Sequence, residues 1–448
     1  MNPDRTSKVQ RPLEIAGALA VIVGFGFLVR FFIVEHYLPA PFVFDTNDTF
    51  MDWFHTAYWA HNPGAYSVWK TIYFPIAFVI TGIFADPRCY ANGPFDARSC
   101  DMVGIAFIGF SYVAAVILSA VAFYRNDRRT ALMRTIAIAL GGSLLFAVER
   151  GNLILQAYVA FVLVFGQLLK SRAAVAWTAG FLVNMKVYLL FPVLAFGIKR
   201  QWRLLELIGL ASLFIYLASI VIVGEGSPLV LASNLQEWLK SSGISIWDQV
   251  ILSTTYQPYL LFDVYQYPIR DFVDQPTVDA VKLFIQYELI ASRGIALACI
   301  AAAWFYPKAV SLNRIVFFVL MQSFIGQNPG GYSIALIVFL VFMERDRNFA
   351  IGLSLLCCYL VSIPMDYSLA TVLSVDRLSW ITGQMAHVDY VLTLGAILRP
   401  LLFLVMVWAL AIDTLIDVHR AVKAGPPVPG LSARPWERKA PERGAVAA

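Results

Sequence analysis

Long apolar runs with almost no charge are the feature that most limits how this chain can fold. Val103–Tyr124 contains no charged residue, and Leu13–Val34 contains only Glu14 and Arg30. A transmembrane α-helix needs about 20 predominantly apolar residues, so each run is long enough to cross a bilayer. Of the 448 residues, 59% are hydrophobic and only 14% are charged, and the mean hydropathy is +0.69. The chain is therefore predicted to be an all-α integral membrane protein rather than a soluble one.

Short basic clusters between the runs predict the topology. Lys8 and Arg11 precede the first run, and the cluster Arg125–Arg129 follows Val103–Tyr124. Because Lys and Arg are retained on the cytoplasmic side of a membrane, residues 35–102 are expected to form an external loop. The same rule makes residues 225–288 a second external loop. The net charge of +5 then reflects topology, and no nucleic-acid partner is expected.

Two apolar stretches are interrupted by polar or Gly-rich residues. Ala173–Ile198 lies between two basic clusters but has the length of one helix, so the chain must enter and return, with a break at Asn184–Lys186. Ile315–Met343 is interrupted in the same way at Gly326–Tyr332. Irregular backbone at membrane depth is tolerated only where it lines a cavity. Both stretches are therefore interpreted as pairs of short helices.

The whole pattern predicts about twelve helical elements. They form one domain, 1–419, with both ends in the cytoplasm, followed by a disordered cytoplasmic tail, 420–448. The first run is too long for a cleaved signal peptide and is expected to remain as an anchor. We therefore expect a multi-pass protein of the bacterial inner membrane, whose large loops face the periplasm.

Two of the five cysteines, Cys89 and Cys100, lie in the first external loop within a segment rich in Gly, Pro and Asp. A disulfide between them fits an oxidising periplasm better than the cytosol. Two unpaired thiols remain the alternative.

Three aspartates, Asp45, Asp48 and Asp52, stand among large aromatic residues just after the first run. If this segment is helical, Asp48 and Asp52 lie four residues apart on one face. Two carboxylates in a partly desolvated site raise the pKa of at least one of them. Such a group can act as a general base towards a hydroxyl. The alternative for each carboxylate alone is a solvated or paired charge at the interface.

Other charged and polar groups are expected at the same outer end. The turn between two uncharged helices carries Glu149, Arg150 and Asn152, and the helix break carries Lys186. Two cations at the end of a helical bundle can clamp an anionic headgroup such as a phosphate. Arg399 lies inside the last span, where a charge is costly and indicates a function. A buried ion pair for Arg399, and snorkelling anchors for the other two cations, remain open.

These residues resemble a known family, the polytopic GT-C glycosyltransferases, and within it the bacterial glycosyltransferase family 87. The resemblance covers roughly residues 13–200. Four motifs carry the resemblance. The first is an acidic residue before an aromatic segment, and the second is a Gly and a Tyr followed by a Tyr and a Pro. The third is a helix that begins with a Gly and a side-chain amide, and the fourth is a short element with a Lys and a Pro. The segments are DTFMDWFHTAYWA (48–60), GAYSVWKTIYFP (64–75), GNLILQAYVAFVL (151–163) and NMKVYLLFP (184–192).

The resemblance implies an enzyme that transfers a hexosyl or pentosyl group from a polyprenyl-phosphate donor at the periplasmic face, and inversion is expected. The acceptor would be a glycolipid or a polysaccharide of the cell envelope. Asp52 best matches the family's acidic position, and Asp48 is the competitor for the role of general base. Arg150, Lys186 and Arg399 are the candidates for binding the donor phosphate.

The remaining polar residues are candidates for contacts with the sugar or the acceptor: Asp45, Glu149, Asn152, Gln327, Asn328 and His387. No HExxH, paired CxxC or nucleotide-binding motif is present, so neither a metal nor a cofactor is predicted. Two other classes stay open. One is a polymerase or ligase of lipid-linked polysaccharide such as O-antigen, and the other is a flippase or transporter of lipid-linked sugars.

Overall fold

The computed structural model describes residues 3–42, 46–241, 253–256, 258–259, 274–327, 330–345 and 347–424. Within this part of the chain, six helical segments are long and apolar enough to cross a membrane, which makes the protein a multi-pass membrane protein. They are α1 (Pro3–Glu35), α5 (Met102–Asn126), the broken helix of α6 (Ala131–Ala139) and α7 (Gly142–Glu149), α11 (Trp202–Val223), α14 (Gln275–Phe305) and α18 (Leu394–Ala424).

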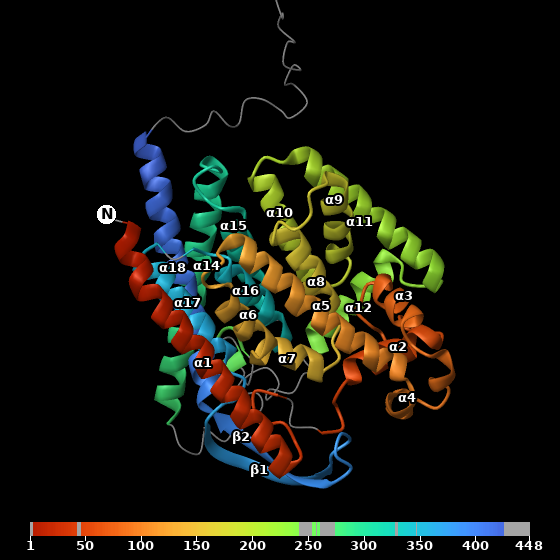
Figure 1. Cartoon of the computed structure of the whole chain (residues 1–448). Coiled ribbons are helices and arrows are strands. Elements are labelled where there is room, and N and C mark those ends of the chain that lie inside the picture. The colour runs from red at the N-terminus through yellow and green to blue at the C-terminus, as the bar shows by residue number, and fades with distance from the viewer. Residues whose placement is uncertain are drawn as a thin grey trace, which may run out of the picture.

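Six shorter helices complete the bundle: α8 (Ile154–Phe165), α9 (Arg172–Val183), α10 (Leu190–Ile198), α15 (Leu312–Gln327), α16 (Ile334–Phe342) and α17 (Phe349–Ser362). Every residue of α16 is buried, and so is most of α8. A helix that is apolar on all sides must be covered by others, and the longer helices surround these two (Figure 1). The core of the protein therefore lies in the short central helices, and each of the twelve expected elements has a counterpart.

Both interrupted stretches are helix pairs, as predicted. In the first pair α9 ends at Val183, and the 3-10 helix η2 (Val187–Leu189) leads into α10. In the second pair η5 (Gly331–Ser333) leads into α16. The first break leaves Lys186 between two helices, where its side chain is not part of a regular helical surface.

The prediction of an all-α fold was incomplete, because residues 368–393 form a β-hairpin. Strand β1 (Ser368–Leu378) pairs antiparallel with β2 (Met385–Thr393). In β2 the buried Ala386 and Val388 alternate with His387 and Asp389, whose side chains are more exposed. This alternation is the strand pattern of period two. Most of the hairpin lies in the connection before the last span, where the sequence analysis predicted no strand.

The boundaries of other elements also differ from those expected. Helix α18 continues to Ala424, so residues 420–424 belong to it and not to the tail, whose other residues lie outside the described part. Helix α14 begins at Gln275 and shortens the second external loop. That loop also contains α12 (Pro228–Ser241). Both long helices carry charged residues on either side of their apolar core. A helix can continue beyond the hydrocarbon region of the membrane, so these helices are longer than their apolar runs.

The first loop contains α2 (Met51–His61), α3 (Pro75–Ile83), the 3-10 helix η1 (Pro87–Cys89) and α4 (Pro94–Cys100). These helices lie together at one corner of the molecule, and the hairpin lies near the same end (Figure 1). The predicted disulfide between Cys89 and Cys100 is present, with its Cα atoms 5.6 Å apart. We call this the loop end.

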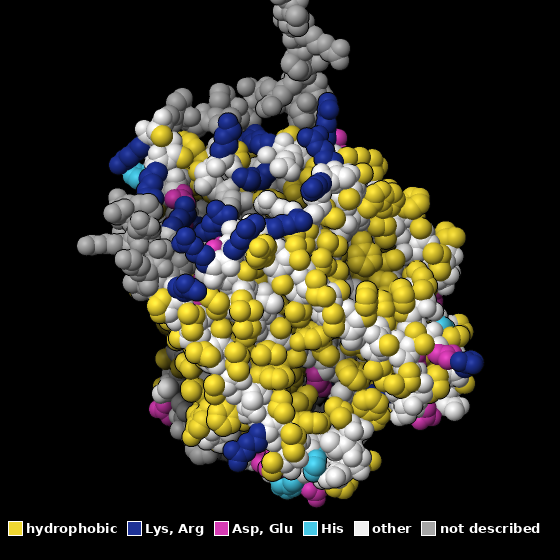
Figure 2. All heavy atoms as spheres, in the orientation of Figure 1, with side chains coloured by type: hydrophobic (Ala, Val, Ile, Leu, Met, Phe, Trp, Pro, Cys, Tyr) yellow, Lys and Arg dark blue, Asp and Glu magenta, His cyan; other side chains and the backbone are white. Residues whose placement is uncertain are grey.

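Lys and Arg side chains gather at the opposite end, above a broad apolar surface (Figure 2). This region, here called the basic end, includes the Arg-rich turn after α5 and the starts of α9 and α11. The apolar surface includes Leu132, Phe214 and Val221, which are 68%, 61% and 83% exposed. Such exposure is expected for side chains that face lipid rather than water.

Candidate functional site

The site at the loop end is built on backbone contacts between the start of α2 and the turn that follows α7. The backbone N–H of Phe50 donates to the carbonyl of Glu149 (2.6 Å), and that of Asp52 donates to the carbonyl of Arg150 (3.0 Å). Gly151 has a φ of +61°, and a Cβ there would meet the carbonyl oxygen of Phe50 at 3.0 Å. Only glycine combines this backbone conformation with so close an approach. The junction therefore fixes the start of α2 against the Glu149–Asn152 turn.

Arg150 bridges the two aspartates that the sequence analysis selected. Its Nη1 forms an ion pair with Asp48, and its Nη2 lies 2.7 Å from Oδ1 of Asp52. Nδ2 of Asn152 donates to the other oxygen of Asp52 (2.6 Å). The side chain of Asp48 is 33% exposed, compared with 20% for Asp52. Asp48 is thus the more accessible of the two carboxylates.

Asn152 is oriented by the helix that follows it. Its Oδ1 accepts a hydrogen bond from the backbone N–H of Ile154 (2.9 Å). This contact satisfies one of the unpaired donors at the start of α8 and turns the amide nitrogen towards Asp52. The residue was a candidate for sugar binding, but in the structure its amide supports the carboxylate.

Lys186 lies beside the same group. Its Nζ is 4.4 Å from the centre of the Tyr73 ring and 5.4 Å from that of Tyr332, and it interacts electrostatically with Asp52. Aromatic faces attract a cation without neutralising it. No carboxylate of the described residues forms an ion pair with Lys186. The ammonium is therefore available to an anionic ligand.

Tyr73 and Tyr332 were not selected from the sequence. Burial is the main cause that raises the pKa of Tyr73 well above its usual value, and the nearby charge of Asp52 adds to it. The hydroxyl of Tyr73 is therefore protonated at neutral pH. Tyr332 ends the Gly-rich interruption Gly326–Tyr332 in the sequence, but only the fold shows that its ring lies beside Lys186.

Two further residues hold the walls of this site. Arg98 of α4 donates from Nη1 to the carbonyls of Asn47 (2.7 Å) and Thr49 (2.8 Å), on either side of Asp48. Glu225 accepts hydrogen bonds from the backbone N–H groups of residues 64–66, at 3.1, 2.9 and 3.4 Å. The latter contacts anchor the segment that leads to Tyr73. In the sequence, Glu225 is an isolated charge between two glycines directly after a span. This isolation is the only feature of the sequence that could have indicated its role.

An apolar groove of about 730 Å³ is lined by residues on both sides of the helix break that carries Lys186. Its wall includes Asn184 and Val187, which lie on either side of Met185 and Lys186 in the sequence. The rest of the wall is almost entirely apolar and comes from α9, α10, α11 and α12, including Val183, Leu190, Ile208, Leu213 and Leu235. A lipid chain can lie in a groove of this composition.

Arg399 pairs with a carboxylate other than Asp48 and Asp52. It forms a buried ion pair with Asp366, and both side chains are almost fully covered, at 5% and 6% exposure. Thr393 donates to the other oxygen of Asp366 (2.9 Å). The alternative of a buried pair thus describes Arg399, and we remove it from the phosphate-binding candidates.

The remaining candidates lie in different places. His387 is in the hairpin, with Nδ1 2.9 Å from Oδ1 of Asp376, and this carboxylate raises the pKa of the imidazole. Glu149 is buried at the end of α7, and its backbone carbonyl helps to form the junction with α2. Asp45 and Asn328 lie outside the described residues, as does the side chain of Gln327.

Metal ligation has no visible support in the described ranges, where no group of three or more His, Cys, Asp or Glu side chains converges. The site is thus defined by two aspartates, Arg150, Asn152 and Lys186 with its aromatic neighbours. No protein-family model, curated protein or solved structure matches the chain. A functional assignment must therefore be argued from this geometry.

Proposed function

We propose that the protein is a membrane glycosyltransferase that uses a sugar linked to polyprenyl phosphate. The observation that carries the proposal is the convergence of Asp48 and Asp52 with Arg150 and Lys186 at the loop end. An apolar groove lined by Asn184 and Val187, the residues on either side of Met185 and Lys186, supports it. A carboxylate can accept a proton from an acceptor hydroxyl, and a cation without a carboxylate partner can bind a phosphate. The groove suits the isoprenoid chain of the donor.

In the proposed reaction, the acceptor oxygen forms a bond to the anomeric carbon while the bond from that carbon to the phosphate oxygen breaks. The hydroxyl proton passes to a carboxylate, and the polyprenyl phosphate leaves with the bonding electron pair. Lys186 stabilises the charge that develops on the leaving phosphate. One direct displacement inverts the anomeric configuration.

Exposure and hydrogen bonding support one choice of general base. Both oxygens of Asp52 accept hydrogen bonds, from Arg150 and from Asn152. Asp48 contacts Arg150 and is more exposed, so we assign proton transfer to Asp48 and the orientation of Arg150 to Asp52. A general base has to be within reach of the acceptor hydroxyl before its basicity matters.

Charge asymmetry supports an orientation for this reaction. Lys and Arg are retained on the cytoplasmic side, so the basic end is assigned to the cytoplasm and the loop end to the periplasm. The disulfide between Cys89 and Cys100 fits an oxidising compartment. We therefore propose an enzyme of the bacterial inner membrane that modifies a glycolipid or polysaccharide of the cell envelope from the periplasmic face.

The test is transfer from synthetic polyprenyl-phosphate sugars by the purified full chain, with product formation followed by mass spectrometry. Asp48→Asn is expected to reduce kcat by about 10²- to 10⁴-fold, the range that a general base contributes. Asp52→Asn is expected to reduce it less. Asp96→Asn, an exposed aspartate of the same loop, is the matched control and should retain full turnover.

Three results would contradict the proposal. They are the absence of transfer from every such donor tried, full turnover in both site variants, and movement of the intact lipid-linked sugar across vesicles without bond cleavage. The last result would assign the protein to the flippases. Extension of a lipid-linked polysaccharide that survives both aspartate substitutions would instead favour the polymerase class.

A further inference from the structure

A second charged hollow lies at the basic end, away from the proposed site. It has a volume of about 1510 Å³ and is bounded by the start of α1, the end of α5, the start of α6 and Arg345. Five guanidinium groups line it, those of Arg11, Arg125, Arg128, Arg129 and Arg345. Figure 2 shows Lys and Arg concentrated on this end of the molecule.

These positive charges are not balanced locally. Asp127 provides the one carboxylate among the lining residues, and its oxygens accept from the backbone N–H of Arg129 (3.0 Å) and the hydroxyl of Thr130 (3.1 Å). Arg128 lies over the ring of Tyr124 at 4.8 Å. Within the described part of the chain, none of the five guanidinium groups forms an ion pair with a carboxylate. The hollow therefore carries an excess of positive charge.

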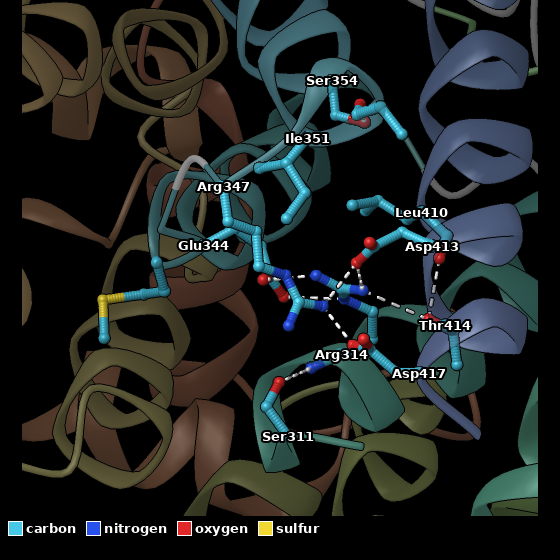
Figure 3. Close-up of polar contacts among 12 residues, drawn as sticks. Ser311, Arg314, Glu344, Arg347, Ile351, Ser354, Leu410, Asp413, Thr414 and Asp417 are labelled. Carbon is cyan, nitrogen blue, oxygen red and sulfur yellow. Dashed lines mark hydrogen bonds and ion pairs between the residues drawn. The ribbon is translucent and has the colours of Figure 1, made fainter. Parts of the chain in front are cut away.

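Neighbouring arginines at the same end are neutralised. Arg314 pairs with Glu344 and Asp413, each at 2.5 Å, and Arg347 pairs with Asp413 (2.6 Å) and with Asp417 (Figure 3). These two arginines beside the hollow thus have carboxylate partners, whereas Arg345 at its edge donates to the side-chain and backbone oxygens of Asn126 (3.2 and 2.6 Å). The unmatched arginines of the hollow indicate that an anion comes from outside the chain.

The wall below the guanidinium groups is apolar. Ile15 of α1, Val121 of α5 and Leu132 of α6 line the hollow. Further along the same helices, Leu19 and Ile117 are 54% and 56% exposed. A ligand with a phosphate at one end and a hydrocarbon chain at the other fits this surface, because the phosphate would meet the guanidinium groups and the chain would meet the apolar wall.

We propose that this hollow binds the headgroup of an anionic glycerophospholipid, with the acyl chains along α1 and α5. Guanidinium groups bind phosphate oxygens in a bidentate manner, and basic pockets between transmembrane helices accept such headgroups. Because five cations face one carboxylate, a headgroup with two phosphates should bind more tightly than one with a single phosphate. Free phosphate lacks the chains and should bind weakly.

The experiment is native mass spectrometry of the full chain in detergent, mixed in turn with cardiolipin, phosphatidylglycerol and phosphatidylcholine. The wild type should retain cardiolipin most and phosphatidylcholine least. The variant Arg125→Gln/Arg128→Gln should lose about 10- to 30-fold in cardiolipin affinity, since each basic residue near a headgroup contributes a factor of several. The control Arg172→Gln/Arg203→Gln removes equal charge from exposed positions of the basic end outside the hollow.

Several outcomes would overturn the inference. One is equal retention of the three lipids by the wild type, which decides the matter even if the double variant does not fold. Another is an equal loss of cardiolipin in the control, because the charge of the whole end would then suffice. A third is thermal stabilisation by inorganic phosphate that matches stabilisation by the lipid. The lipid site is independent of glycosyl transfer, so either proposal can fail alone.

Discussion

The two ends of the molecule each contain a network of arginine and carboxylate groups, but the networks differ in burial and balance. At the basic end, the side chains of Arg314 and Asp413 are 4% and 1% exposed, and each charge meets an opposite one. At the loop end, Arg150 and Asp48 are 15% and 33% exposed, and Lys186 adds a cation that is surrounded by aromatic rings. An ion pair in a membrane protein does not by itself mark a functional site. A partly exposed network with an unmatched cation beside a groove is the stronger signal.

The largest effect on stability is expected at the basic end. Arg314→Met removes the shared partner of the buried Asp413 and the half-buried Glu344, and leaves Asp413 only Arg347 and Asn348. This should cost about 3–5 kcal/mol of unfolding free energy. The measurement is thermal or denaturant unfolding in detergent. Arg150→Met, at the partly exposed network, should cost clearly less. Equal losses in the two variants would remove the distinction between the networks.

Lys186→Met should show the opposite balance of effects. Removal of one group that stabilises the leaving phosphate is expected to reduce kcat by about 10²- to 10³-fold, while the unfolding free energy changes little because no carboxylate of the described residues pairs with it. Turnover and unfolding of the same preparation provide the measurement. Lys170→Met, an exposed lysine just before α9 at the basic end, is the control. A large loss of stability with turnover intact would make Lys186 a structural residue.

Gly151→Ala tests the junction that holds the loop-end network together. The new Cβ would lie 3.0 Å from the carbonyl oxygen of Phe50 at a left-handed φ, so we expect a loss of about 1–2 kcal/mol and reduced transfer. Gly209→Ala in α11 has nothing within 4 Å and should slightly stabilise the helix. Unfolding curves of both variants are the measurement. An unaffected Gly151 variant would mean that the junction tolerates movement.

The smallest effect concerns the exposed pair His387 and Asp376 in the hairpin. Because Asp376 raises the pKa of His387 in the folded protein, the pair stabilises the hairpin below about pH 6.5, the unfolded value, and this contribution is lost as pH rises through the raised pKa. Asp376→Asn should lower the pKa of His387, as measured by NMR titration. Glycosyl transfer should not change, since neither residue contacts the loop-end network.

Prediction from sequence succeeded where a pattern was local. Uncharged runs predicted the spans, and the break at Asn184–Lys186 followed from two basic clusters separated by too short a distance for two full helices. Arg399 could not be assigned, because its partner Asp366 is distant in sequence and lies in a connection that carried no helical pattern. The hairpin was missed since the strand alternation of Met385–Thr393 continues directly into an apolar helix.

The sequence by itself determined that this is a helical membrane protein, which segments are long and apolar enough to cross a bilayer, and where the basic clusters lie. Hydrophobic length and charge act on each segment separately. Only the tertiary structure decided which charges meet. Arg150 reaches Asp48 and Asp52 from about a hundred residues away, and Lys186 enters the same site because a helix break happens to lie beside the first loop. Electrostatic interactions depend on distance in space, and distance in space is set by the packing of helices that no local pattern encodes.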